Sequence, residues 1–423
     1  MAIKVCDAIM GSGKTSATIS LFNSHPEKKY IYITPYLDEA SRIRDACPKL
    51  RFVEPSRNLP DFGFKKYNHT LELIKEGKNI TSTHKMFTMY TEEMTYWIKQ
   101  WGYTLVIDEA VDIFENSKIS LDDISLLKDV GWLVENDEGF KIDSHDYKRG
   151  KFEKIVALSK SNRLVRLYNV DGSASSKVYY WMLFKELFEA FDDVYVLTYL
   201  FEHQIMKYYF DLNNVTYENI GISHPSDSEY YFSDTPDYIP EYVANLVNKI
   251  HIVENDKLNS IGDEKNALSS SWVDRSIKDP DHENLRALKN NINNFFRNYN
   301  GDISADKRLW SVYNKATPYI RAKGFYRSDL AFNTKATNEH SDKTALAYCV
   351  NVYMLPCIKN HLISCGIRPD EERYALSIMV QWIWRSAIRK GEEIHLYVPS
   401  KRMREVLKEW IDEVQASYYS SVA

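Results

Sequence analysis

Apolar and polar positions alternate in a way that predicts strands and helices in turn along the first half of the chain. Short apolar runs rich in β-branched and aromatic residues predict strands at residues 3–6, 30–34, 79–83, 103–107 and 194–198. Amphipathic stretches between them predict helices at residues 37–47, 70–76, 85–98 and 181–191. Continuous apolar strands separated by helices favour a parallel sheet covered on both faces.

Two segments interrupt this rhythm. Residues 115–180 hold a short helix pattern at 121–130 and a hairpin pattern at 131–142, with a turn near 136–139, and we interpret them as an insertion. Residues 213–248 are rich in Asn, Ser, Asp, Tyr and Pro, which favours a linker.

A second alternating block follows the predicted linker. Its expected strands are residues 249–253, 309–313, 330–333 and 394–398, and its expected helices are 284–297, 343–362 and 373–389. A last amphipathic helix begins after Ser400, a favourable N-cap. The expected organisation is therefore an α/β fold with a first lobe at 1–212 (insertion at about 115–180), a linker at 213–248 and a second lobe at 249–423.

Composition excludes several classes of protein. Hydrophobic residues make up 44% of the 423 positions and charged residues 27%, unlike a disordered chain, a collagen or a coiled-coil rod. The net charge of −5 argues against a wholly basic nucleic-acid coat but allows a local basic groove. The five cysteines show no C-x-x-C pair or zinc spacing, as in a reduced cytosolic protein. With no signal peptide or membrane span visible, we expect a soluble cytoplasmic protein without a membrane partner.

The sequence DAIMGSGKTS follows the first predicted strand and precedes a helix. Glycines let the backbone curl around phosphate oxygens at a helix N-terminus, which predicts a phosphate loop binding ATP with Mg²⁺. Lys14 would contact the β- and γ-phosphates, and Thr15 would hold Mg²⁺. The alternative is a glycine-rich turn with a solvated lysine, since Ala8 stands where the pattern normally has its first glycine. The expected nucleotide-binding residues are Gly11, Ser12, Gly13, Lys14, Thr15 and Ser16.

Two adjacent carboxylates, Asp108 and Glu109, come directly after the predicted strand at 103–107. Residues just past the carboxyl end of a parallel strand lie at the ligand crevice. Asp108 would bind Mg²⁺, and Glu109 would orient or deprotonate the attacking water. The alternative is a helix N-terminus whose acidic residues favour the helix dipole.

Gln381, Arg385 and Arg389 recur every fourth residue in a predicted helix, which places them within one arc of its face. Guanidinium groups beside apolar area suit a cleft that contacts a triphosphate. The alternative is that the arginines form the solvated side of an amphipathic helix.

Together these segments resemble superfamily 2 helicases, or DEAD-like ATPases, and most closely their compact bacteriophage members. The resemblance spans roughly residues 3–415 and is carried by AIMGSGKT, VIDEA, LTYLFEHQ and QWIWRSAIR. It implies two RecA-like lobes that sandwich ATP, with nucleic acid crossing both. The last motif of the family usually has two residues between its two arginines, whereas three residues separate Arg385 from Arg389. Arg385 is therefore taken as the expected arginine finger.

The resemblance also implies further roles. Thr198 occupies the place of a motif that couples hydrolysis to movement. Expected nucleic-acid contacts at strand ends and in a second-lobe motif are Thr34, Pro35, Tyr36, Thr83, His84, Asn333, Lys335, Thr337 and Asn338. Ordinary turn chemistry or a polar loop remains the alternative for each of these groups.

The resulting hypothesis is an ATP-driven helicase or translocase acting on single-stranded or forked DNA in phage replication or recombination. RNA is the alternative substrate, and a replication protein is a candidate partner. Two other functions stay open. An ATP-gated binding protein would clamp DNA or a partner without unwinding, and a phage DNA-packaging ATPase would add a nuclease domain.

Overall fold

The computed structural model describes residues 2–35, 37–56, 66–111, 113–116, 119–136, 139–142, 150–152, 164–171, 173–181, 183–226, 229–235, 241–299, 301, 303–334 and 339–422. The chain divides into two compact units. The first comprises Met1–Asp7, Gly13–Pro236 and Leu355–Pro369, and the second comprises Ala8–Ser12, Asp237–Met354 and Asp370–Ala423. After residue 13, the chain therefore passes between the units three times.

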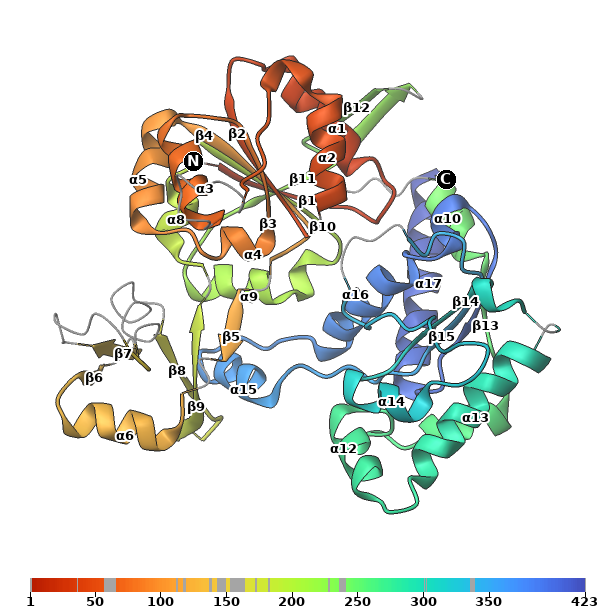
Figure 1. The fold of residues 1–423 in the computed structure, drawn as a ribbon. Coiled ribbons are helices and arrows are strands. Elements are labelled where there is room, and N and C mark those ends of the chain that lie inside the picture. The colour runs from red at the N-terminus through yellow and green to blue at the C-terminus, as the bar shows by residue number, and fades with distance from the viewer. Residues whose placement is uncertain are drawn as a thin grey trace. The chain divides into compact units, whose positions relative to one another are not determined.

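The first unit is built on a seven-stranded sheet with the strand order β12-β11-β1-β10-β4-β2-β3 (Figure 1). All neighbouring strands are parallel except β11 and β12. In register, Asp7 lies opposite Thr198, and Leu197 lies opposite Asp108, so the carboxyl ends of β1, β10 and β4 adjoin. The strands are β1 Ala2–Asp7, β2 Lys29–Thr34, β3 Ile80–Thr83, β4 Tyr103–Asp108, β10 Asp193–Thr198, β11 Glu218–Ser226 and β12 Glu229–Ser233.

Both faces of this sheet are covered, as the apolar strands predict. Ile31 and Ile33 of β2 belong to a core cluster with helices α3, α5, α8 and α9. The alternate side chains Tyr30 and Tyr32 pack against Phe22 of α1, with ring centroids 4.4 and 6.3 Å apart. The helices are α1 Lys14–Ser24, α2 Leu37–Ala46, α3 Lys66–Lys75, α4 His84–Phe87, α5 Glu92–Trp101, α8 Lys185–Glu189 and α9 Ile205–Leu212.

The segment predicted as an insertion forms small antiparallel sheets of its own. Strands β5 (Phe114–Asn116), β9 (Ala174–Trp181) and β8 (Leu164–Tyr168) make one sheet, and β6 (Leu133–Asn136) and β7 (Gly139–Ile142) make the predicted hairpin. Helix α6 (Leu121–Asp129) begins with a capping box between Ser120 and Asp123. Helix α15 (Pro356–Ser364) lies beside β8 (Figure 1).

The second unit contains a four-stranded, wholly parallel sheet in the order β13-β16-β15-β14. Phe295 of α13 stacks on Tyr397 of β16, and Trp382 of α16 packs on Tyr348 of β15. The strands are β13 Ile250–Ile252, β14 Arg308–Ser311, β15 Ala345–Tyr348 and β16 Ile394–Tyr397. The helices are α10 Glu241–Val247, α11 Asp256–Asn259, α12 Ser270–Lys278, α13 Glu283–Asn298, α14 Thr317–Ile320, α16 Glu371–Ile383 and α17 Lys401–Val422.

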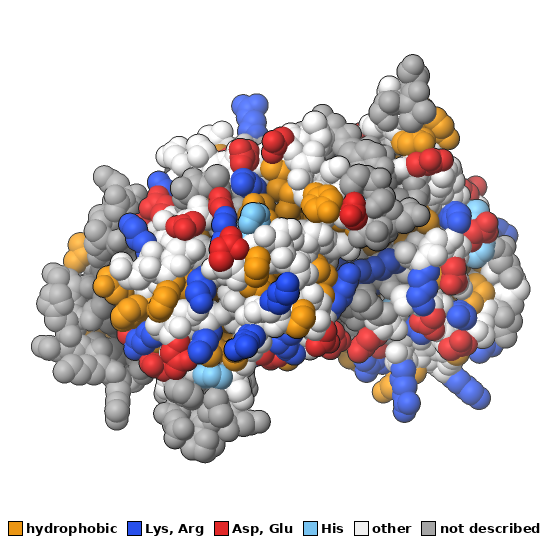
Figure 2. All heavy atoms as spheres, turned by 90° about the horizontal axis from the view of Figure 1, so that it is seen from above, with side chains coloured by type: hydrophobic (Ala, Val, Ile, Leu, Met, Phe, Trp, Pro, Cys, Tyr) orange, Lys and Arg blue, Asp and Glu red, His pale blue; other side chains and the backbone are white. Residues whose placement is uncertain are grey.

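The predicted fold class is confirmed. The protein is α/β, with two RecA-like lobes, each a mainly parallel sheet flanked by helices, and with an insertion in the first lobe. Over the described parts of the chain, no helix combines the length and the apolar character needed to cross a membrane. Basic and acidic side chains are interspersed over the face shown in Figure 2.

The linker predicted at 213–248 is wrong. This segment forms β11 and β12 of the first sheet and helix α10 of the second unit. Ile220 and Ile222 of β11 are buried, and Phe232 of β12 packs on Tyr195 at 5.2 Å between ring centroids. Polar residues that resembled a linker, such as Ser223, His224 and Glu229, are exposed on these two strands, because one side of each strand faces away from the core.

Two predicted elements of the second lobe are also wrong. Residues 330–333 make a turn rather than a strand, and only a single bridge joins Asp329 to Trp310. The helix expected at 343–362 is instead β15, a loop and α15. Proline at position 356 begins α15, as expected of a residue that fits the first turn of a helix but not its interior.

Candidate nucleotide-binding site

The loop from β1 to α1, which the sequence predicts to be a phosphate loop, contains two glycines with a left-handed backbone. Gly11 and Gly13 have φ values of 86° and 97°, a left-handed conformation that glycine adopts without strain. Ser12 N–H donates to the Ile9 carbonyl at 3.2 Å, and Ala17 N–H donates to the Gly13 carbonyl at 2.8 Å as α1 begins. The chain therefore turns sharply into the N-terminus of an eleven-residue helix, whose dipole favours anions.

The side chains of this loop fit an oxygen-rich ligand. Lys14 is buried, with only 9% of the residue exposed. The Ser12 hydroxyl is buried and has no hydrogen-bond partner among the described residues. A buried polar group without a partner is costly unless a ligand or water completes it. Thr15 and Ser16 follow in the first turn of α1, both half-buried.

The predicted carboxylates lie at the end of β4, on the same sheet edge. Glu109 is buried, has φ 64°, and its N–H donates to the Leu197 carbonyl of β10 at 2.8 Å. The Tyr32 hydroxyl donates to Asp108 Oδ2 at 3.1 Å. The carbonyl oxygen of Asp108 lies 2.8 Å from His84 Nε2. Neighbouring strands thus hold both residues in place.

The pKa of Asp108 is raised to about 7, chiefly by burial and in part by the negative charges of Glu109 and Glu39. The Lys14 ammonium group acts in the opposite direction and lowers the pKa of this carboxyl. Residues far apart in the sequence, Lys14 and Asp108, are therefore close enough to influence each other. The oxygens of the Asp108 carboxylate and of the Thr15 hydroxyl are the kind of ligand that a hard divalent ion such as Mg²⁺ takes.

No pattern in the sequence singles out Asp7, which ends β1 directly before the predicted phosphate loop. Its Oδ1 accepts the Leu200 N–H at 2.7 Å, and its Oδ2 accepts the Phe201 N–H at 2.8 Å. In the same loop, Gln204 Nε2 lies 3.0 Å from Thr198 Oγ1 and donates to the Tyr199 carbonyl at 2.7 Å. The predicted coupling residue Thr198 is fully buried in this network.

His224 and Tyr230 of the β11–β12 hairpin form an aromatic pair that the sequence did not predict. A Cβ on Gly13 would lie 2.2 Å from Cδ1 of Tyr230, so the tyrosine ring packs directly on the phosphate loop. His224 stacks on Tyr230 with ring centroids 4.2 Å apart and planes 10° apart. No sequence pattern signalled these residues, because the segment resembled a linker.

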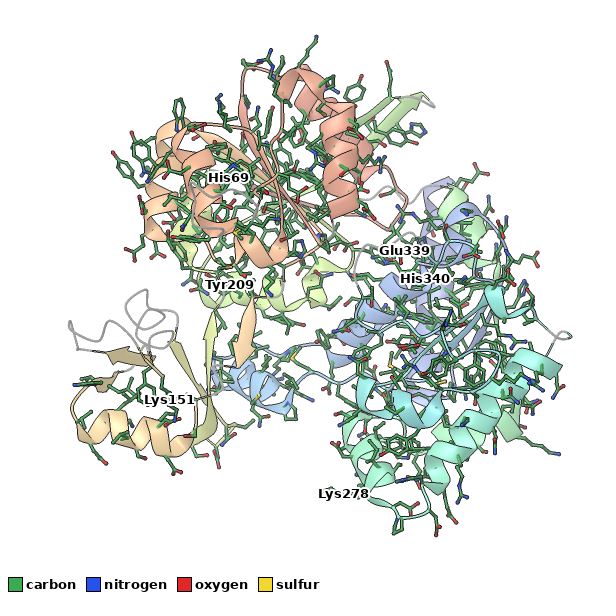
Figure 3. The ribbon with its side chains drawn as sticks, viewed as in Figure 1. His69, Lys151, Tyr209, Lys278, Glu339 and His340 are labelled. Atoms are coloured by element: carbon green, nitrogen blue, oxygen red, sulfur yellow. The ribbon has the colours of Figure 1, made fainter. Side chains whose placement is uncertain are left out.

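A cavity of about 580 Å³ opens at the carboxyl ends of β2 and β3. Thr83, a predicted nucleic-acid contact, lines it and also caps α4 by accepting the Met86 N–H at 3.4 Å. Lys85 is exposed there. Ser56 lies on the wall, and its N–H donates to Nδ1 of His69, which Figure 3 labels, at 2.9 Å. The other lining residues are Leu37, Glu54, Pro55, Lys66, Met86 and Met89.

The remaining predicted nucleic-acid contacts are not gathered there. Thr34, the last residue of β2, is fully buried, and Pro35 is half-buried. Asn333 is exposed in the turn after residue 330. Four predicted contacts lie outside the described residues: Tyr36, Lys335, Thr337 and Asn338.

The single-face arrangement predicted for Gln381, Arg385 and Arg389 is wrong. Helix α16 ends at Ile383, because the Ser386 hydroxyl donates to the Ile383 carbonyl at 2.6 Å and the Ala387 N–H donates to the Lys343 carbonyl at 2.9 Å. Gln381 is half-buried in the helix. Arg385 lies in the following turn, 3% exposed, and Arg389 is exposed in a 3₁₀ turn at Ala387–Lys390.

Comparison with known proteins places the chain in a family. Residues 244–411 match the family described as the YonV C-terminal Rossmann-like domain. The chain is 36% identical over 420 residues to the SPbeta prophage-derived uncharacterized protein YonV of Bacillus subtilis (strain 168), across 97% of this chain and 98% of that protein.

Two solved structures show weaker similarity. The structure of S. tokodaii Xpd4 aligns over 97% of this chain and 94% of its own, with 12% identity and a TM-score of 0.46. The crystal structure of a hypothetical ATP-dependent RNA helicase from Sulfolobus tokodaii aligns over 96% and 90%, with 12% identity and a TM-score of 0.26. The similarity to the Bacillus protein extends over nearly the full length of both chains, and this chain therefore belongs to the YonV family.

Proposed function

We propose that this protein is an ATP-dependent nucleic-acid motor, a DNA helicase or translocase. One observation carries the proposal: the phosphate loop ends in a buried lysine whose charge acts on Asp108 across the same sheet edge. Phosphoryl transfer needs groups that bind phosphates and groups that activate the attacking water. The glycine-containing loop, the helix N-terminus, the lysine and the acidic pair supply them in this proposal.

The predicted catalytic and nucleotide-binding residues of the first unit have separate roles in this proposal. The N–H groups at the start of α1 and the Lys14 ammonium group bind the phosphates. Thr15 and Asp108 would hold Mg²⁺, which neutralises charge on the phosphate oxygens. Glu109 orients or deprotonates the attacking water, and the hydrogen bond from its backbone N–H to the Leu197 carbonyl holds its main chain at the end of β4.

The second unit contributes Arg385, which we propose as the arginine finger. Such a group typically accelerates hydrolysis about 10³–10⁵-fold. Gln381 and Arg389 are proposed as further contacts to the triphosphate, although they do not share one helix face with Arg385 as the sequence analysis expected.

We propose that the cavity beside β2 and β3 binds the nucleic-acid backbone. Lys85 and Thr83 offer an ammonium group and a hydroxyl group to phosphate oxygens, and exposed Leu37 and Met89 offer apolar area to bases. Arg44 and Lys66 both pair with Glu54, which leaves Lys85 as the more available cation of this wall. DNA is the proposed substrate, and phage DNA metabolism is the proposed context because the Bacillus relative is named as prophage-derived.

The test measures ATP hydrolysis with single-stranded DNA, duplex DNA and RNA in parallel, together with strand displacement from a forked duplex. We expect DNA-stimulated hydrolysis in the wild type, its loss in Lys14→Ala and Glu109→Gln, and no change in Lys78→Ala. Lys78 is a suitable control because its side chain is exposed and, among the residues that the structure describes, pairs only with Glu76, at 3.7 Å.

The outcomes separate the candidate functions. Hydrolysis with strand displacement supports a helicase, and hydrolysis with DNA binding but without displacement favours an ATP-gated clamp or a translocase. Hydrolysis that persists in Lys14→Ala, or that no nucleic acid stimulates, contradicts the proposed motor.

A further inference from the structure

The loop between β10 and α9 is held by a carboxylate that comes from another strand. Asp7 engages two successive N–H groups, those of Leu200 and Phe201, with one oxygen each. Leu200 has φ 57°, a left-handed conformation that is unfavourable for a residue other than glycine. Successive N–H groups in such a turn form a concavity that binds anions, and the Asp7 carboxylate occupies it.

Asp7 is therefore joined to two functional segments at once. It is covalently followed by the phosphate loop, and its carboxylate fixes the residues that follow the predicted coupling residue Thr198. Burial raises the pKa of Asp7 above its ordinary range, while the two N–H groups and the nearby Lys14 charge oppose that shift. A buried acidic group with both oxygens engaged by N–H groups of this loop is placed to hold it rather than to bind metal.

The far side of the same loop is held by a second side chain. Gln204 contacts the Thr198 hydroxyl and the Tyr199 carbonyl, and it is buried. Residues 199–204 are thus fixed from β1 by Asp7 and from their own end by Gln204. Any displacement of the end of β1 acts on this loop through two hydrogen bonds.

We propose that Asp7 is a positioning residue that transmits the nucleotide state of the phosphate loop to residues 199–204. The inference rests on the proposed function and adds a route for communication within the first unit. Nucleotide binding shifts the loop that begins at Ala8, Asp7 follows it, and the N–H groups of Leu200 and Phe201 follow Asp7. The role is indirect, because Asp7 engages backbone N–H groups rather than the phosphates.

Asp7→Asn is the decisive variant because it keeps the side-chain shape. Its single oxygen accepts one N–H, while its NH₂ group faces the other N–H, so one bond is lost and two donors oppose each other. Asp193→Asn is the matched control, since Asp193 begins β10 and its side chain, within the described part of the chain, forms ion pairs with Lys4 and Lys28 at 4.0 and 3.8 Å.

The assay separates binding from coupling. For Asp7→Asn we expect the Kd for a fluorescent ADP to change less than about threefold and the DNA-stimulated kcat to fall about tenfold or more. Hydrogen exchange of residues 199–204 should respond to ADP in the wild type and in Asp193→Asn but not in Asp7→Asn. A purely structural role for Asp7 would instead weaken binding and turnover together.

The results that overturn the inference are distinct from those that overturn the proposed function. Asp7→Asn with wild-type turnover, or with proportional losses in binding and kcat, refutes the inference alone. If Asp7→Asn does not fold, Gln204→Ala takes its place, and normal stimulated turnover in that variant refutes it equally. A wild-type protein that hydrolyses no ATP refutes the proposed function and the inference with it.

Discussion

Replacing Asp108 by asparagine should change how the stability of the first unit depends on pH. The carboxyl has a folded-state pKa of about 7 against an ordinary value of 3.8. Between these values the folded protein binds more protons than the unfolded chain, so the free energy of unfolding falls as pH rises from about 4 to about 7. The difference of about three units corresponds to about 4 kcal/mol at most.

Asp108 is partly exposed, and solvent screening reduces this effect. We expect the free energy of unfolding of Asp108→Asn, relative to that of the wild type, to be about 1–3 kcal/mol higher at pH 8 than at pH 5. Asparagine retains an oxygen that can accept the Tyr32 hydroxyl, so the variant removes the charge and preserves that hydrogen bond. The wild type should lose stability over this range, and the variant should lose much less.

Urea denaturation at pH 5, 6, 7 and 8 in EDTA measures the effect, with hydrogen exchange of β4 reporting on the first unit. Asp123→Asn serves as the control. Hydrogen bonds from Lys151 and Ser120 lower the pKa of Asp123, so its titration ends below this pH range and leaves the profile unchanged. Parallel pH profiles for the wild type and Asp108→Asn would refute the assignment of a proton-binding carboxyl at this edge.

Three further predictions concern the loop, the cavity and the second core. Gly13→Ala should abolish binding of a fluorescent ADP, because φ is +97° and the new methyl carbon would lie 2.2 Å from the Tyr230 ring; wild-type affinity would contradict this geometry. Lys85→Ala should weaken binding of a single-stranded oligonucleotide and reduce the salt slope by about 1, whereas Lys78→Ala should change neither. Leu346→Ala, at a fully buried position in β15, should lower the free energy of unfolding by about 2–5 kcal/mol in urea titrations.

The strands of the first sheet were predictable because their signal is local. Residues 103–107 are apolar except for Thr104, and the structure buries all five in β4. The helix of the phosphate loop and the carboxylates after β4 were predictable for the same reason, since each depends on a short run of neighbouring residues.

Apolar runs without a clear period were the main source of error in the second lobe. Residues 345–350 are wholly apolar, and the sequence alone does not distinguish a buried helix from a central strand. These residues form a strand because β15 pairs with β14 on one side and with β16 on the other. Proline at position 356 was the available signal that a helix begins there rather than continues.

Long-range contacts of the candidate site left no pattern in the sequence. Asp7 and Leu200 are joined by a carboxylate and a backbone N–H, and any residue type can supply such an N–H. Tyr230 meets Gly13 through a hairpin whose polar composition resembled a loop. The prediction that the two arginines share one helix face was wrong because hydrogen bonds of Ser386 and Ala387 end the helix before Arg385. Helical periodicity in the sequence gives no sign of these bonds.

The three passages of the chain between its units set a limit on how this protein can be taken apart. A gene fragment ending at residue 236 would lack Leu355–Pro369, and with it the helix that lies beside β8. The complementary fragment would carry that helix without its neighbour. Neither fragment therefore contains all the segments of one unit. Recombination at a single junction would exchange only part of a lobe and yield two incomplete proteins. We expect the two lobes to be inherited together.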